Sequence, residues 1–260
     1  MRAEPIRHQR SEGSILLRMG NMGLKRLREA HAAKLRMPAG SHEAILINTG
    51  GGLAGGDRFT FDITAENQAR LTITSQAAER VYRSLGPAAE IDISLTAGDG
   101  ASLLWLPQET ILFDGARLSR RIAADLGSGA RLVAVESIIL GRAAMGEEVR
   151  QAHLRDHWRI RQEGRLLFAD TVVLDGAPPA SAATLDGARA FATVVAVCPE
   201  AGSLLEPVRA AIGERGAASA WSGKLIARLV ARDGFELRKS LIPALTALAG
   251  QAGLPKTWSL

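Results

Sequence analysis

Two glutamates stand inside strongly apolar stretches, where a carboxylate needs a physical explanation. Glu109 lies within LLWLPQETILF and Glu136 lies within LVAVESIIL. A carboxylate that is buried without a partner is strongly unfavourable, because it loses its hydration and gains nothing in return. Each glutamate therefore forms an ion pair, faces water, or lines a polar passage. The arginines considered as ion-pair partners are Arg80, Arg83 and Arg142.

The alternative to these ion pairs is a wet interior route lined by oxygen atoms. Other polar residues in the same part of the chain would contribute hydroxyl and carboxylate oxygens to it. The candidate interior residues are Asp57, Thr74, Ser75, Tyr82, Glu109, Glu136 and Arg142. The ion pair is the simpler interpretation, since structural ion pairs also place carboxylates in apolar sequence. The sequence leaves both interpretations open.

A glycine-rich loop precedes these residues. Gly50, Gly52 and Gly55 satisfy the G-x-G-x-x-G pattern of dinucleotide-binding turns. Such a turn opens a helix that holds the pyrophosphate, whereas the residues after Asp57 alternate between apolar and polar, as in a strand. We therefore predict a tight strand–loop–strand connection without a nucleotide. The glycines expected to shape this loop are Gly51, Gly52, Gly55 and Gly56.

The remaining reactive side chains do not form a catalytic motif. The sequence contains no G-x-S-x-G, C-x-x-C or H-E-x-x-H pattern, so hydrolase and zinc-enzyme functions are not favoured. His153 and His157 would share one face of a strand, but a metal site needs a third ligand, and we expect a solvated surface pair. Cys198 is expected to be a buried small apolar side chain.

Composition limits the class of protein further. Of 260 residues, 47% are hydrophobic, which is enough for one large core. Lys and Arg number 32 against 27 Asp and Glu, but the basic residues are dispersed and aromatic residues make up only 4%, which argues against a nucleic-acid binder. No stretch has the length or apolarity of a signal segment or a membrane span, and a single cysteine fits a reducing compartment. We expect a soluble, cytoplasmic protein with one domain over residues 1–260, in which residues 1–13 form a flexible arm.

The elements that must position the candidate residues repeat along the chain. An Ala-x-Leu tripeptide recurs at Ala69, Ala101, Ala116 and Ala130, and the segments GDGASLL and GSGARLV lead into ETILF and ESIIL. Each of the two longer units contains a glycine turn, an apolar strand, a carboxylate and a second apolar strand. Strand units repeating about every 15 or 30 residues indicate stacked coils, because no unit buries its apolar face alone. We predict a mainly β fold, layered like a β-helix, with a few α-helices chiefly in the C-terminal quarter.

Hairpins and loops are predicted at three places. SILLRMGNMGLKRLREA is read as strand and loop, because Gly20 and Gly23 interrupt its helical spacing. The segment HWRIRQEGRLLFADTVVLDG predicts a hairpin that turns at residues 162–164. Another strand pair is predicted at residues 221–241, WSGKLIARLVARDGFELRKSL, with a turn about Asp233 and Gly234.

Helix signals are confined to the end of the chain. A capping box from Ser203 to Glu206 predicts one helix, with Gly213 as its stop. A second helix is predicted over residues 240–249, with Pro243 in its first turn.

Four blocks of sequence carry a resemblance to a known family. They are NTGGGLAGGD (48–57), ITSQAAERVYRS (73–84), LLWLPQETILFDGA (103–116) and ESIILGRAAMGE (136–147). The blocks stand in the family's order and cover the central third of the chain densely. Through them the chain resembles the urease accessory protein D family (UreD, called UreH in some systems).

This resemblance implies a nickel-insertion chaperone, not an enzyme, with a mostly β fold. Proteins of this kind bind apo-urease, join the accessory proteins UreF and UreG, and help to deliver nickel while UreG hydrolyses GTP. The resemblance also implies an internal polar tunnel, so we expect transient Ni²⁺ at Asp57, Glu109 and Glu136 and no tightly bound cofactor. A rival interpretation is a metal-free docking protein that only remodels apo-urease for its partners.

Overall fold

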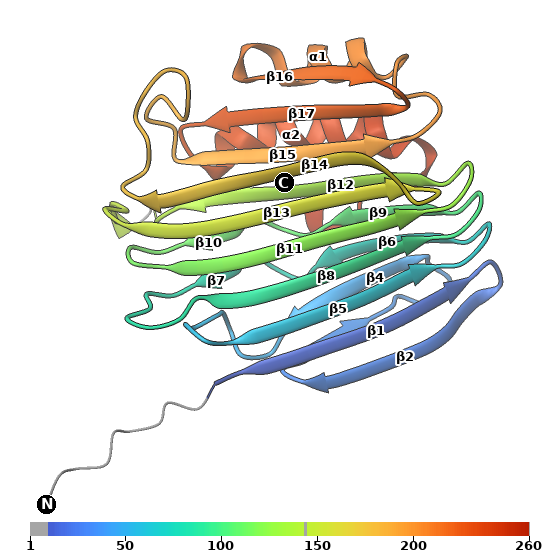
Figure 1. The fold of residues 1–260 in the computed structure, drawn as a ribbon, viewed down its shortest axis with the longest axis horizontal. Helices are drawn as coiled ribbons and strands as arrows, with labels where there is room; N and C mark the ends of the chain where they lie inside the picture. The colour runs from blue at the N-terminus through green and yellow to red at the C-terminus, as the bar shows by residue number, and fades with distance from the viewer. Residues whose placement is uncertain (1–9, 143–144, 260) are drawn as a thin grey trace, which may run out of the picture.

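Two β-sheets packed face to face form the body of the protein (Figure 1). The structure is a computed structural model that describes residues 10–142 and 145–259. Sheet A, nearer the viewer in Figure 1, has the strand order β14 (Arg165–Gly176), β13 (Ala152–Gln162), β11 (Arg117–Leu126), β8 (Ala89–Ala97), β5 (Arg58–Ala65), β1 (Glu12–Gly20), β2 (Gly23–His31).

The second sheet, sheet B, lies behind the first. Its main strand order is β16 (Gly216–Trp221), β17 (Lys224–Ala231), β15 (Ala190–Val197), β12 (Arg131–Leu140), β9 (Ser102–Leu106), β6 (Arg70–Ser75), β4 (Glu43–Asn48), β3 (Ala33–Arg36). Two short strands extend it, because β10 (Thr110–Leu112) pairs with β12 and with β7 (Glu79–Val81).

The chain passes repeatedly from one sheet to the other, so that parallel strands stack as successive coils. In sheet B, Leu71 of β6 aligns with Leu103 of β9, which aligns with Leu132 of β12. Three copies of the Ala-x-Leu repeat therefore stack in one row, whereas the copy at Ala116 leads into β11 of sheet A. The predicted layered, β-helix-like architecture is confirmed, and the shorter spacing in the repeat arises because the chain alternates between the sheets.

Two apolar cores result from this arrangement. The larger core fills the space between the sheets, and the smaller one lies between sheet B and two helices, α1 (Leu205–Ile212) and α2 (Gly234–Ala249). Strand β12 serves both cores because it is covered on both faces. Val133 and Val135 face the helices, while Ala134 and Glu136 face sheet A. Strand alternation thus directs the Glu136 carboxylate into the layer between the sheets.

The first two predicted strand regions form hairpins. Strands β1 and β2 pair antiparallel around Asn21 and Met22, so the segment with Gly20 and Gly23 is two strands and a tight turn. The hairpin between β13 and β14 turns at residues 163–164, as the sequence predicted. Residues 1–9 of the predicted arm lie outside the described residues, whereas residues 12 and 13 already belong to β1 and are not an arm.

The hairpin predicted about Asp233 and Gly234 is wrong. Strands β16 and β17 do pair, but they turn at Ser222 and Gly223, whose positive φ angles of 48° and 73° suit a tight turn. Asp233 instead caps α2, since its side chain accepts a hydrogen bond from the Glu236 backbone N–H at 2.8 Å. Helix α2 therefore begins six residues before the predicted start at residue 240, and Pro243 lies inside it.

The first helix is present and ends at Gly213 as predicted, but its predicted capping box is not formed. The Ser203 hydroxyl donates to the Glu200 carbonyl oxygen at 2.9 Å, and Leu204 occupies the N-cap position without a side-chain bond. Both helices nevertheless belong to the C-terminal quarter, as predicted. In the part of the chain described, neither helix has the length and apolarity needed to cross a bilayer.

Candidate functional site

A cavity of about 280 Å³ lies between the two sheets. Aromatic and aliphatic side chains form most of its wall, among them Phe59 and Phe61 from sheet A and Trp105 from sheet B. The polar lining includes the carboxylates of Glu79 and Glu136. Arg80, Arg120 and several uncharged polar side chains complete the lining. A concave site with convergent polar groups is the usual form of a site that binds a small species.

The deep end of the cavity is a buried ion cluster centred on Arg120. Its guanidinium donates two hydrogen bonds to Asp156, with Nε at 3.0 Å from Oδ1 and Nη2 at 2.7 Å from Oδ2. Arg120 Nη1 also pairs with Glu136 Oε2, and the Trp105 indole N–H donates to Glu136 Oε1 at 2.9 Å. The three charged side chains are each at most 4% exposed. Sheet A supplies Arg120 and Asp156, and sheet B supplies Glu136, so the cluster joins the two layers.

The protonation of Glu136 is finely balanced. Burial raises the pKa of Glu136 to about 7, against the opposing effect of the Arg120 guanidinium. The negative charge of Asp156 adds to the increase. A carboxyl group with such a pKa exchanges its proton near neutral pH, which is typical of functional sites and also occurs in structural ion clusters.

A second carboxylate lies nearer the cavity mouth, where the lining residues Gln76, Ala77 and Arg80 are exposed. Glu79 is half-buried there, and both of its oxygens accept from the Asn48 side-chain amide, at 3.1 and 3.2 Å. Burial also raises the pKa of Glu79 to about 7, with the Asn48 hydrogen bond opposing the shift. In both carboxyl groups of the cavity, burial favours the protonated form and raises the pKa.

The predicted interior residues do not all lie in this cavity. Ser75, Glu136 and the loop residues Gly51 and Gly52 line it. Ser75 donates from its hydroxyl to the Ala77 carbonyl oxygen at 3.0 Å and accepts from the Gln108 N–H at 2.8 Å. The remaining predicted residues lie elsewhere, and each has a clear local partner.

Asp57 stabilises the turn at the base of the glycine-rich loop. Its carboxylate accepts from the Ser11 N–H at 2.8 Å and from the Ala54 N–H at 2.7 Å. These two hydrogen bonds from backbone N–H groups explain why the Asp57 carboxylate can be buried. The loop itself packs against β7, since Leu53 and Val81 form a parallel bridge.

The glycines allow this close approach of the loop. A Cβ on Gly52 would collide with the Tyr82 ring and lie 2.9 Å from the Arg80 carbonyl oxygen, and Gly52 also has φ of +146°. A Cβ on Gly55 would collide with the Ser84 hydroxyl, and Gly51 and Gly56 have positive φ angles. Strand β5 follows the loop where a dinucleotide site requires a helix, as the alternating sequence predicted.

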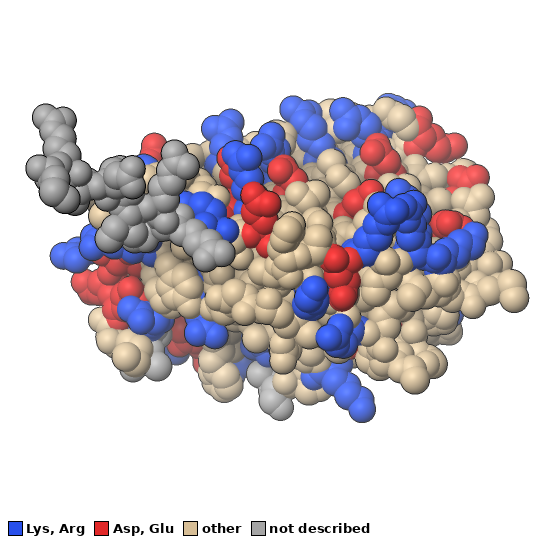
Figure 2. All heavy atoms as spheres, turned by 90° about the horizontal axis from the view of Figure 1, so that it is seen from below, with Lys and Arg blue, Asp and Glu red and all other residues tan. Residues whose placement is uncertain are grey.

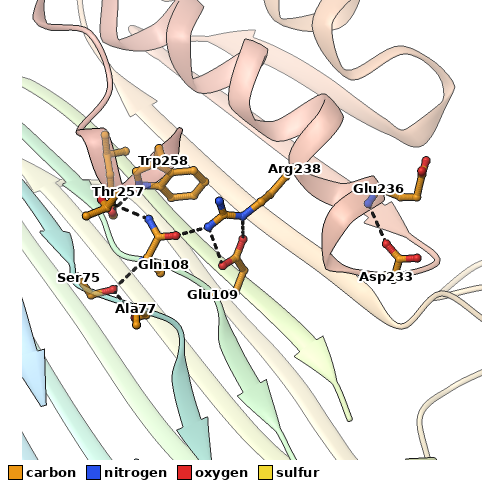
Figure 3. A network of polar contacts seen from close by, with 10 residues as sticks. Ser75, Ala77, Gln108, Glu109, Asp233, Glu236, Arg238, Thr257 and Trp258 are labelled. Carbon is orange, nitrogen blue, oxygen red and sulfur yellow. Dashed lines mark hydrogen bonds and ion pairs between the residues drawn. The ribbon is translucent and has the colours of Figure 1, made fainter. Parts of the chain in front are cut away.

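Glu109 belongs to a polar network on the helix side of sheet B (Figure 3). Arg238 of α2 binds its carboxylate through two nitrogens, at 2.6 and 3.1 Å, and also contacts the Gln108 side chain. Close by, the Trp258 indole N–H donates to the Leu106 carbonyl oxygen at 2.9 Å. This network fastens α2 and the C-terminal segment to the end of β9.

Three further predicted residues make separate local contacts. Thr74 and Thr257 share a hydrogen bond of 2.9 Å between their hydroxyls. The Tyr82 hydroxyl donates to the Gly51 carbonyl oxygen at 2.8 Å. Arg142 pairs with Glu147 at 2.9 Å.

The arginine partners proposed from the sequence are wrong for both glutamates. Glu136 pairs with Arg120 and Glu109 with Arg238, rather than with Arg80, Arg83 or Arg142. The ion pair itself, which was the simpler interpretation, is confirmed for both. The sequence positions involved are too far apart for a local pattern to reveal them.

The histidines and the cysteine form no metal site with each other. His153 pairs with Asp175, and the His157 Nδ1 lies 2.7 Å from the Thr171 hydroxyl, both on the outer face of sheet A. Cys198 is buried, and burial raises the pKa of its thiol. Across residues 10–142 and 145–259, no three His, Cys, Asp or Glu side chains are grouped in a way that could hold a metal ion.

Three functional candidates were missed from the sequence: Glu79, Arg120 and Asp156. A signal existed for the last two, because each occupies an inward position of an alternating strand. Arg120 lies at the alternate position between the buried residues Leu118 and Ile122 of β11. Asp156 lies in the same way between the buried residues Leu154 and Trp158 of β13. A charged residue at such a position must find a buried partner.

Comparison with known proteins places the chain in a family. The sequence model described as UreD urease accessory protein matches residues 11–259. The chain belongs to the UreD family. Its UreD relatives include the urease accessory protein UreD of Rhizobium rhizogenes, 48% identical over 248 residues, which cover 93% of this chain and 91% of the relative. UreD 1 of Brucella abortus is 46% identical over 259 residues, covering 96% of this chain and 92% of the relative.

A third UreD relative, from Mesorhizobium japonicum, is 44% identical over 254 residues, covering 93% of this chain and 90% of its own length. All three relatives are named as urease accessory proteins. The resemblance noted in four sequence blocks is thus confirmed over nearly the whole chain. UreD membership assigns the chain an accessory role in relation to urease.

Proposed function

We propose that this chain is a urease maturation factor that binds apo-urease together with UreF and UreG and assists nickel insertion into the urease active site. Membership of the UreD family supports the accessory role. The observation that carries the nickel part of the proposal is the cavity between the sheets, where Glu79 and Glu136 present carboxylates within an apolar wall. The single cysteine fits the reducing cytoplasm as the place of action.

Carboxylate chemistry suits the transient passage of Ni²⁺. Oxygen ligands hold this ion less tightly than imidazole or thiolate does, so the ion can be released again. Because the pKa of Glu79 and of Glu136 is about 7, protons compete with the cation for both groups near neutral pH. Asp156 compensates the charge of Arg120, which would otherwise repel a cation at the deep end. In this proposal GTP is used by UreG, and this chain holds no tightly bound cofactor.

A metal-free docking protein is the second candidate function. Two observations favour it: Asp57 accepts from backbone N–H groups, and Glu109 is held by Arg238, so both have structural explanations. In that case the chain only remodels apo-urease for its partners. Interior carboxylates would then matter through stability alone.

Urease activity in cells that co-express apo-urease and the other accessory proteins with nickel tests the proposal. We expect activation to depend on this chain and to fall several-fold with Glu79→Gln and with Glu136→Gln. Glu214→Gln, a change of the same type at an exposed position, is the matched control and should leave activation unchanged. Pull-down of the assembled complex and the melting temperature of each variant are measured alongside.

The combination of these measurements separates the two functions. Lost activation with normal assembly and melting temperature supports passage of nickel through the cavity. Activation that falls only in step with assembly or stability supports the docking function. Full activation of urease without the chain would contradict both proposed functions.

A further inference from the structure

Strand β13 presents an unbroken row of basic residues on the outer face of sheet A. Its inward positions are apolar or, at Asp156, part of the buried ion cluster. The five outward positions are His153, Arg155, His157, Arg159 and Arg161. In a strand, alternate side chains lie about 6.6 Å apart, so this row is a regular ladder of cationic or titratable groups. We call these five residues the β13 ladder.

No acidic residue lies directly opposite the middle of the β13 ladder on the adjoining strands. Arg155 lies between Ser119 of β11 and Val173 of β14 in the sheet register. Arg159 lies between Ala123 and Ala169. Among the residues that the structure describes, neither arginine forms an ion pair, although both are exposed. This is uncompensated positive charge.

A hollow of about 370 Å³ marks the same part of the surface. It is lined by Ser119, Arg121, Arg155 and His157, and by Arg120, whose guanidinium lies in the buried cluster between the sheets. No carboxylate of the described residues lines the hollow. Arg121 is partly neutralised by Asp92 at 2.9 Å, and His157 binds Thr171 through Nδ1. Hydroxyl, imidazole and guanidinium groups around one hollow suit a carboxylate ligand.

We propose that the β13 ladder is a docking surface for an extended, carboxylate-bearing segment of a protein partner. Carboxylates at alternate positions of an extended segment have the same spacing as Arg155, His157 and Arg159, so they can meet these groups in register. Val173, 58% exposed beside Arg155, offers an apolar contact next to the charges. This surface lies on the outer face of sheet A, and its assignment does not depend on the passage of nickel through the interior.

The pattern favours a protein over a nucleic acid. Acidic residues bound the uncompensated charge at both ends, since Asp175 pairs with His153 and Asp125 adjoins Arg161 in the register. The remaining stretch from Arg155 to Arg159 spans only about 13 Å. The outward positions opposite it on β11 and β14 carry no aromatic side chain on which a base can stack.

Fluorescence anisotropy with the full chain tests this assignment. The probe is a labelled peptide of about eight residues that alternates Glu and Val, long enough to follow the strand. A peptide that alternates Lys and Val and a single-stranded RNA of mixed sequence are the comparison probes. We expect the acidic peptide to bind, more weakly at high salt, and its Kd to rise at least about tenfold in Arg155→Glu/Arg159→Glu.

The matched control is Arg26→Glu/Arg28→Glu, which changes the net charge equally on β2. Both arginines are exposed, and at that end of the molecule basic and acidic side chains are interspersed (Figure 2). The control variant should bind like the wild type. If the charge reversal perturbs the far-UV circular dichroism spectrum, Arg155→Ala/Arg159→Ala replaces it and should weaken binding in the same direction.

Three outcomes would overturn the assignment. The first is no binding of the acidic peptide, and the second is equal weakening in both double variants, which indicates a general charge effect. The third is tighter binding of the RNA through Arg155 and Arg159, which indicates a nucleic-acid surface instead.

Discussion

Glu79 and Glu136 lie at two depths of the same cavity, and each has a raised pKa. Glu79 sits near the mouth with the Asn48 amide as its partner, and Glu136 sits at the bottom with Arg120 and Trp105. In both, loss of hydration outweighs the favourable contacts and raises the pKa to about 7. A raised pKa makes the free energy of unfolding depend on pH, and this dependence can be measured without any partner or metal.

We expect Glu79 to contribute a fall in the free energy of unfolding as the pH rises from about 4.5 to about 7. Over this window native Glu79 keeps a proton that the unfolded chain has already lost. The stability that this proton provides at low pH is therefore lost as the pH rises through the pKa of Glu79 in the folded protein. In Glu79→Gln this part of the fall, roughly 2 kcal/mol, should disappear. Urea unfolding near both ends of the window measures it, with Glu214→Gln as the exposed control. Identical pH dependence in wild type and Glu79→Gln would contradict the prediction.

Among the secondary-structure elements, the two C-terminal helices differ in how they begin. Asp233 caps α2 with a side-chain hydrogen bond of 2.8 Å to the Glu236 N–H, whereas α1 begins at Leu204 without such a bond. Serine is a common N-cap residue, but the Ser203 hydroxyl donates its hydrogen bond to the Glu200 carbonyl oxygen instead. The residue type alone therefore does not identify the cap.

The two candidate caps should respond differently to the same substitution. Asp233→Ala should lower the free energy of unfolding by about 1 kcal/mol, because the first turn of α2 loses an acceptor for its free N–H groups. Ser203→Ala should change it by less than about 0.5 kcal/mol, because the hydroxyl it removes is exposed and caps no helix. Chemical denaturation of both variants provides the test. A larger loss in Ser203→Ala than in Asp233→Ala would show that the cap is assigned to the wrong residue.

At the scale of the whole molecule, the cluster of Arg120, Glu136 and Asp156 joins the two sheets inside an otherwise apolar layer. Buried ion clusters are often no more stabilising than apolar residues of similar size. Removing a single member is far more costly, because the partners remain buried with uncompensated charge. The intact cluster is therefore expected to add little net stability, although breaking it is costly.

Arg120→Met should lower the free energy of unfolding by about 3–5 kcal/mol, because it leaves Glu136 and Asp156 together without a cation. The triple variant Arg120→Met/Glu136→Gln/Asp156→Asn should recover most of this loss, because no buried charge remains. Equilibrium unfolding in urea compares the two. If the triple variant were as unstable as the single one, packing around Arg120 rather than its charge would be responsible.

Much of the architecture followed from local patterns. The alternation after Asp57 predicted a strand rather than a helix behind the glycine-rich loop, and the repeat of glycine turn, strand and carboxylate predicted stacked coils. The hairpin between β13 and β14 followed from its turn residues. Such features are set by the conformational preferences of neighbouring residues, which the sequence displays directly.

The candidate site depended on contacts between distant residues. The sequence indicated Glu136 as a candidate but not Arg120 or Asp156. It also suggested the wrong arginine partners for Glu109, because Arg238 is 129 positions away. It also read Asp233 and Gly234 as a turn, since the same residues suit a turn and a helix cap. The sequence by itself determined the alternating strands after the glycine-rich loop, the β13–β14 hairpin and the repeat that stacks the coils. Only the tertiary structure decided which charges meet in the interior, because the order in which strands pair across two sheets is not a local property.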